Sequence, residues 1–138
     1  MKSDAITEII EAQLPSQYEP LLLTFYGNDV EKDGNLAVFG DDSGTKLCID
    51  LEDAFVYSID PKNELPTRLV NTNVNCLAKF LVAHQQYVTE VRRASSEVGQ
   101  LQSVRRLSER LFKIDARAFD DSENWWPVVL RQIEDGLL

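Results

Sequence analysis

Apolar and polar residues alternate most regularly in the middle of the chain. In residues 46–51, Leu47, Ile49 and Leu51 occupy every second position, and Cys48 falls on the opposite, otherwise polar side. A period of two is typical of a β-strand with one buried face. The pattern therefore predicts a strand whose leucine and isoleucine side chains enter the core.

Further short apolar runs surround this strand, and turn residues separate them. We expect strands at residues 36–39, 54–59 and 67–70, with a tight turn at 40–44. Because the connections are short, successive strands have to form an antiparallel meander. The apolar run at residues 19–26 fits either a strand or a buried helical turn, since eight residues are too few for periodicity to separate the two.

The period changes after residues 71–73, whose side chains can cap the first free amides of a helix. From Val74 to Val91 the apolar residues form one helical stripe. Similar patterns predict helices at about residues 4–14, 98–112 and 124–134. Together with the meander, these helices indicate a single α+β domain over residues 1–138.

The composition is that of an ordinary globular domain, with 43% hydrophobic and 27% charged residues. No apolar run approaches the roughly 20 residues that span a bilayer. The first residues are not followed by the apolar segment of a signal peptide. The two cysteines, Cys48 and Cys76, do not make a disulfide framework. We therefore expect a protein of the cytoplasm.

The net charge of −9 is unevenly distributed. Residues 1–64 hold 14 acids and 4 bases, whereas residues 65–138 hold 9 acids and 10 bases. Such a field repels nucleic acid and anionic lipid and attracts a basic partner, so we expect neither nucleic-acid nor membrane binding. The alternative is that the acidity only keeps the protein soluble. The six arginines of residues 92–117 are spread along predicted helices, which indicates a solvated face.

Several acidic residues and one tryptophan are candidates for partner binding. The acidic residues lack the D-x-D-x-D-G spacing of a calcium loop, so we predict no metal site. They either form turns at a solvated edge or form an edge whose carboxylates substitute for phosphates in a basic nuclease groove. Charge of this kind speeds association more than it adds affinity. Tryptophan is enriched at binding hot spots, although at least one residue of the Trp125–Trp126 pair is expected in the core. The candidates are Asp41, Asp42, Asp50, Glu52, Asp53 and Trp125.

A catalytic site is not predicted. The single histidine, His84, could in principle activate Cys48 or Cys76 as a nucleophile. Neither cysteine lies in a glycine-rich nucleophile context, so a structural histidine is the better interpretation. We expect no enzyme activity and no cofactor.

The chain resembles the SUKH superfamily of immunity proteins, most closely its fourth immunity subfamily, over roughly residues 10–135. The family pattern has a glycine at a strand end, a small polar turn and an acidic residue on the next strand. A V-Y-x-x-D strand, an asparagine-led helix and a late tryptophan follow. The matching residues are Gly40, 41–44, Asp50, 56–60, Asn71 with Leu77, Phe80 and Leu81, and Trp125-Trp126. The usual serine after Asn71 is replaced, with Asn73 and Asn75 nearby.

The resemblance implies a curved antiparallel sheet packed by helices. It also implies a non-catalytic protein that binds and neutralises a cognate secreted polymorphic toxin. Other members of the superfamily act as regulators or adaptors on the same scaffold, and that alternative stays open. The sequence does not indicate the oligomeric state.

Overall fold

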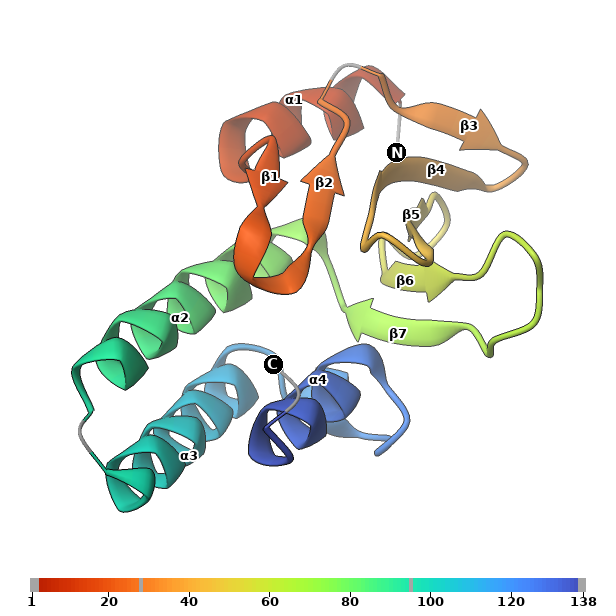
Figure 1. Cartoon of the computed structure of the whole chain (residues 1–138). Coiled ribbons are helices and arrows are strands. Elements are labelled where there is room, and N and C mark those ends of the chain that lie inside the picture. The colour runs from red at the N-terminus through yellow and green to blue at the C-terminus, as the bar shows by residue number, and fades with distance from the viewer. Residues whose placement is uncertain (1–2, 28, 95, 137–138) are drawn as a thin grey trace.

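The computed structural model describes residues 3–27, 29–94 and 96–136, and within these ranges it contains four α-helices and seven strands (Figure 1). The helices are α1 (Ser3–Gln13), α2 (Val74–Arg93), α3 (Glu97–Ile114) and α4 (Trp125–Glu134), with 3-10 turns η1 (Glu19–Leu21) and η2 (Ala116–Phe119). The strands are β1 (Gln17–Tyr18), β2 (Leu23–Phe25), β3 (Glu31–Asp33), β4 (Leu36–Asp41), β5 (Lys46–Asp50), β6 (Val56–Ile59) and β7 (Arg68–Asn71).

All strand pairs are antiparallel, and the sheet has the order β1-β2-β4-β5-β6-β7. Strand β3 pairs with the first half of β4, beside the segment where β2 pairs with its end. The predicted α+β class and the meander from β4 to β7 are confirmed. Strands β1 and β3 were not predicted, because β1 has two residues and all three residues of β3 are exposed.

Phe39 and Gly40 interrupt the regular pairing of β4. The register with β5 shifts between Val38 and Gly40, which marks a β-bulge at Phe39. A Cβ atom at Gly40 would lie 2.5 Å from the Thr24 carbonyl oxygen of β2. Only glycine therefore lets β2 approach β4 at this point.

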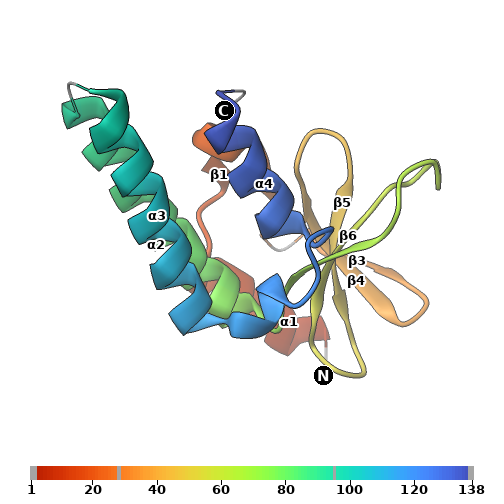
Figure 2. The same cartoon turned by 90° about the horizontal axis from the view of Figure 1, so that it is seen from below.

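The helices cover one side of the sheet. Figure 2 shows α2, α3 and α4 on the same side of strands β4 to β7, and no helix of the described residues lies on the opposite side. The covered side carries Phe39, Leu47, Ile49 and Val56, all almost completely buried. These side chains form the core with α2 and α4, as the alternation of residues 46–51 predicts.

A buried polar network joins β7, η2 and α4. The Asn71 side chain donates to Asp115 Oδ2 at 3.0 Å, and Asn71 Oδ1 accepts from the Trp126 indole at 3.0 Å. The Thr72 backbone N–H and hydroxyl also donate to Asp115, at 2.9 and 3.2 Å. The network corrects part of the capping prediction: Asn73 caps α2, accepting from the Cys76 N–H at 2.8 Å, whereas Asn71 is a buried link between the sheet and the C-terminal helices.

Candidate partner-binding surface

The side of the sheet that faces away from α2, α3 and α4 has an apolar centre. Its middle row runs across the sheet through paired residues of β4, β5, β6 and β7, namely Val38, Cys48, Tyr57 and Leu69. Paired residues of neighbouring strands project to the same side. Cys48 is only 2% exposed, so the strand alternation that placed it on a polar face was wrong about its surroundings. Its row neighbours are half-buried and cover it.

Acidic residues border this apolar row, and we call the two together the outer face. Glu31 is the partner of Val38 in the middle row, and Asp33 and Asp50 are the two partners of Leu36 in the next row. Asp41 pairs with Lys46 on the other side of the row, and Ile59 follows Lys46. The outer face therefore includes Leu36, Val38, Cys48, Tyr57, Ile59 and Leu69, with Glu31, Asp33, Asp41, Asp50 and the cation Lys46.

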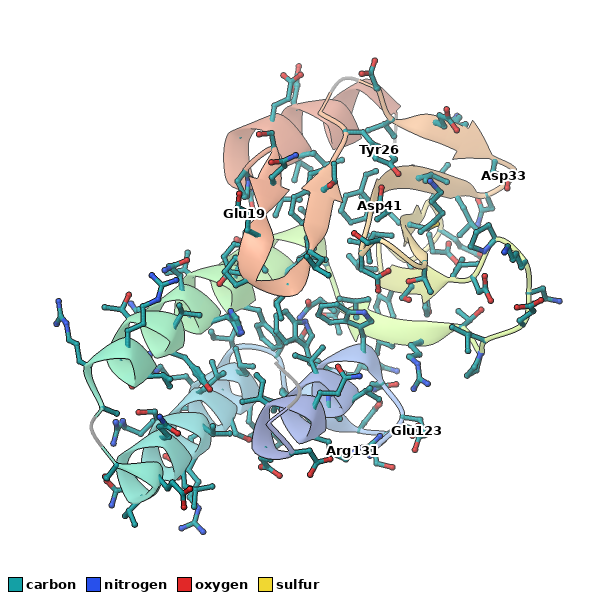
Figure 3. All side chains as sticks on the ribbon, viewed as in Figure 1. Glu19, Tyr26, Asp33, Asp41, Glu123 and Arg131 are labelled. Atoms are coloured by element: carbon teal, nitrogen blue, oxygen red, sulfur yellow. The ribbon has the colours of Figure 1, made fainter. Side chains whose placement is uncertain are left out.

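Asp41 is held in place by a tyrosine. The Tyr26 hydroxyl donates to Asp41 Oδ2 at 2.7 Å, and the two side chains point toward one another (Figure 3). Lys46 Nζ in turn donates to the Tyr26 oxygen at 3.0 Å. Asp41 Oδ1 accepts from the Ser43 N–H at 3.0 Å. Burial and the Asp41 hydrogen bond raise the pKa of Tyr26, so the phenol stays a donor at neutral pH.

Asp42 lies in the β4–β5 turn and connects it to α4. Its Oδ1 accepts from the N–H groups of Gly44 and Thr45, at 3.1 and 2.6 Å. Its Oδ2 accepts from the Trp125 indole at 3.1 Å. Trp125 itself is 8% exposed and packs edge-on against Trp126, with ring centroids 4.9 Å apart. Trp125 therefore lies beneath the turn, where its indole positions Asp42.

The remaining three candidates lie around the β5–β6 turn. Asp50 Oδ1 accepts from the Asn35 amide at 3.1 Å and from the Glu52 N–H at 2.8 Å. Asp53 Oδ1 accepts from the Phe55 N–H at 2.8 Å. The interpretation as turn-formers is thus correct for Asp50 and Asp53. The second carboxylate oxygen of both aspartates accepts no hydrogen bond from any described residue. The third candidate, Glu52, is exposed.

The structure divides the five acidic candidates into two groups. Asp41 and Asp42 lie where β5 begins, whereas Asp50, Glu52 and Asp53 lie where it ends. The five residues of β5 separate the groups by about 13 Å at 3.3 Å per residue. The apolar row of the outer face lies between them.

The described residues hold no cluster of three or more histidine, cysteine or acidic side chains that could bind a metal ion. Among those same residues, no helix is both long and apolar enough to cross a membrane.

A comparison with protein families finds the model of the SUKH-4 immunity protein, which matches residues 28–132. The chain belongs to the SUKH-4 immunity protein family. Neither the curated proteins nor the solved structures contain a match to it. The resemblance noted from the sequence is thereby confirmed, and family membership supports an immunity role. The matched range includes the whole outer face and the buried network of Asn71, Asp115 and Trp126.

The thiols and the histidine of this SUKH-4 protein have the properties of structural groups. Burial raises the pKa of Cys48 to about 11, with a further contribution from the Asp33 carboxylate, and burial also raises the pKa of Cys76. Both thiols are thus protonated at neutral pH, unlike a catalytic cysteine. His84 Nδ1 lies 2.6 Å from the Tyr18 hydroxyl. Burial lowers the pKa of His84 to about 4, so the ring is neutral.

Sequence reasoning missed three residues that form or support the candidate surface or the buried network of this SUKH-4 protein. Tyr26 supports Asp41, and Tyr57 lies at the centre of the outer face, where burial and then the Asp53 and Asp50 carboxylates raise its pKa. Both were ordinary aromatic residues of apolar runs in the sequence. In the sequence, Asp115 has the pattern of a solvated acidic residue after a helix. Its hydrogen-bond partner Asn71 lies 44 residues away. No local pattern could have paired them.

Proposed function

We propose that this protein binds a cognate secreted toxin in the cytoplasm and neutralises it by covering a basic surface of the toxin with the outer face. The observation that carries the proposal is an apolar row with an acidic group on each side, one where β5 begins and one where it ends. Family membership supports the immunity role, and the charge supports the class of partner. A nuclease is the matching kind of toxin, since it has to hold phosphates with cations.

Two properties of the acidic groups support their contact with a partner. Each aspartate is fixed by hydrogen bonds inside its own turn, so little side-chain entropy remains to be lost on binding. The free oxygens of Asp50 and Asp53, and the exposed Glu52, keep their capacity to accept hydrogen bonds. Such preorganised carboxylates fit the lysine and arginine side chains of a basic groove and steer its approach.

The apolar row supports a stable complex rather than a transient encounter. Val38, Tyr57 and Leu69 are half-buried and lie in one row on β4, β6 and β7, with Cys48 of β5 between the first two. Residues of this kind at the centre of an interface, surrounded by polar groups, carry most of the binding energy in measured complexes. We expect Tyr57→Ser to weaken toxin binding about thirtyfold or more, corresponding to roughly 2 kcal/mol.

The proposed role is tested by expressing the candidate toxin encoded beside this gene with and without the immunity protein. The expected result is that cells survive only with the immunity protein, and that the two proteins copurify as a complex. Death of the host despite a well-expressed immunity protein, or a toxin that remains uncomplexed, would refute the role. Capture of a housekeeping protein in place of the toxin would support the regulatory alternative.

The proposed surface is tested by neutralising its charges without disturbing its turns. In Asp50→Asn/Glu52→Gln/Asp53→Asn the amide oxygens still accept the turn hydrogen bonds, while three charges are removed. The matched control is Glu97→Gln/Glu109→Gln/Glu134→Gln, which removes three exposed charges from α3 and α4. At low salt the first variant should associate about tenfold more slowly than the control, measured by stopped flow. Equal association rates would remove this turn from the interface.

A further inference from the structure

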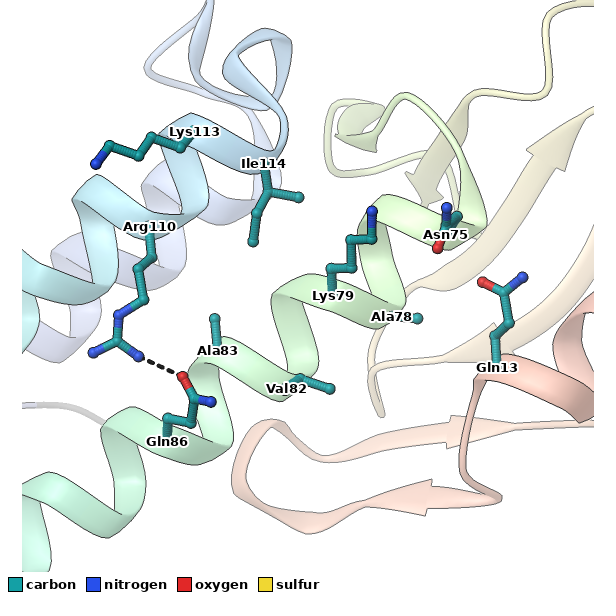
Figure 4. Close-up of a pocket in the computed structure, with 10 residues that line it drawn as sticks. All are labelled: Gln13, Asn75, Ala78, Lys79, Val82, Ala83, Gln86, Arg110, Lys113 and Ile114. Atoms are coloured by element: carbon teal, nitrogen blue, oxygen red, sulfur yellow. Dashed lines mark hydrogen bonds between the residues drawn. The ribbon is translucent and has the colours of Figure 1, made fainter.

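A second open surface lies on the helices and shares no residue with the outer face. It is a groove of about 620 Å³ between α2 and α3, and Gln13 at the end of α1 forms one side (Figure 4). Its apolar residues are Ala78, Val82, Ala83 and Ile114. Val82 is 61% exposed, so the groove is open along its length rather than an enclosed pocket.

The charges that line the groove are all positive, in a chain whose net charge is −9. Arg110 is already paired, since it donates to Gln86 at 2.6 Å and to Glu90 at 2.9 Å. Lys79 and Lys113 form no ion pair among the described residues, although Glu109 lies one helical turn before Lys113. Two free cations therefore flank an apolar floor.

The groove also has the length of a short helix. On α2 its residues Asn75, Lys79, Val82 and Gln86 recur at spacings of four, three and four, which forms one stripe over three turns. At 1.5 Å per residue this stripe is about 16 Å long. An amphipathic helix that lies in an apolar groove uses anchors at the same spacing. The open floor suits such a helix better than a small ligand, which would be mostly enclosed.

We infer that this groove binds an acidic amphipathic helix of a partner protein, independently of the outer face. The apolar side of that helix contacts Ala78, Val82 and Ile114, and its carboxylates lie opposite Lys79 and Lys113. The protein then has two docking surfaces of opposite character: an acidic one on the sheet and a basic one on the helices.

The test uses a fluorescent 15-residue helical peptide with leucines at i, i+3, i+4 and i+7 and glutamates at the flanking positions. Binding is followed by fluorescence anisotropy and by amide chemical shifts of the full-length, ¹⁵N-labelled protein. Two further peptides serve as comparisons: one replaces each glutamate by lysine, and one scrambles the order. The expected result is that only the acidic amphipathic peptide binds, with shift changes confined to α2 and α3 around Val82.

Two protein variants locate the contact. Lys79→Glu/Lys113→Glu should weaken peptide binding at least tenfold, whereas Arg93→Glu/Arg105→Glu, which makes the same charge change at exposed sites on the same two helices, should not. Val82→Asp should also abolish binding, and the amide spectrum shows whether each variant is folded. Equal binding of acidic and basic peptides, or shift changes outside the groove, would overturn the inference. Laurate, an anionic amphiphile, serves as a further probe; if it binds and the peptide does not, the groove takes a small amphiphile and the inference is overturned. A self-association of the protein that Val82→Asp abolishes would also overturn it, because the groove would then bind a second copy of the chain.

Discussion

The polar side chains at the two faces of the sheet differ in burial and in how many of their hydrogen-bonding atoms are paired. On the covered face, Asn71 and Asp115 are buried, and they hydrogen-bond to each other and to the Thr72 and Trp126 donors. At the β5–β6 turn beside the outer face, Asp50 and Asp53 use one carboxylate oxygen for their turns, and the other accepts no hydrogen bond from a described residue. Buried polar groups without partners cost free energy, whereas exposed ones can keep capacity for a partner. The covered face thus stabilises the fold, and the outer face is available for binding.

The largest expected change in the free energy of unfolding comes from an aromatic residue packed against the covered face, compared with one on the outer face. Trp126 is fully buried against Phe80, with ring centroids 5.2 Å apart, and its indole satisfies Asn71. Trp126→Ala should lower the free energy of unfolding by about 3–5 kcal/mol, measured by urea denaturation. Tyr57→Ala on the half-buried outer face should cost only about 1 kcal/mol. Similar losses for the two variants would contradict the contrast.

The second prediction concerns the buried carboxylate. Asp115→Ala leaves the Asn71 amide and two Thr72 donors without their acceptor, and should cost about 3 kcal/mol in the same measurement. The exposed Glu134 on α4 is the control, and Glu134→Ala should change stability by less than about 0.5 kcal/mol. A small loss for Asp115→Ala would mean that water replaces the carboxylate without difficulty.

The third prediction is a pH dependence that originates on the covered side. His84 titrates at about 4 in the folded protein, below its ordinary value of 6.5, because burial disfavours the charged ring. The unfolded chain therefore binds the proton more readily, so stability should fall as the pH drops below about 6.5. Between pH 7 and pH 5 the loss from this group should be about 2 kcal/mol. In His84→Gln, whose amide can still accept from Tyr18, this part of the pH dependence should disappear; an unchanged slope would assign it to the carboxylates.

The smallest expected change in the stability of the protein comes from neutralising two aspartates at the β5–β6 turn beside the outer face. In Asp50→Asn/Asp53→Asn, each amide oxygen can replace the carboxylate oxygen that accepts the turn N–H. The free energy of unfolding should change by less than about 0.5 kcal/mol at neutral pH. A loss of more than about 1 kcal/mol would show that these charges support the fold, and would weaken their assignment to a partner.

Local sequence patterns predicted most of the secondary structure, for a physical reason in each case. The alternation at residues 46–51 follows from the pleat of β5, and the stripe from Val74 to Val91 follows from the helical period of α2. Asn73 could be predicted as a cap, since capping involves residues three apart. Strand β3 could not be predicted, because its three exposed residues have no apolar side and only their pairing with β4 makes them a strand.

The sequence by itself also determined the acidic N-terminal half and the family resemblance, since charge and short motifs need no folding to be visible. Only the tertiary structure decided which of those acids face a common surface. It placed Trp125 beneath Asp42, 83 residues away, buried Cys48 between Val38 and Tyr57, and left an apolar row between two acidic groups. Contacts of this kind depend on how distant segments pack together, and local periodicity carries no information about that packing.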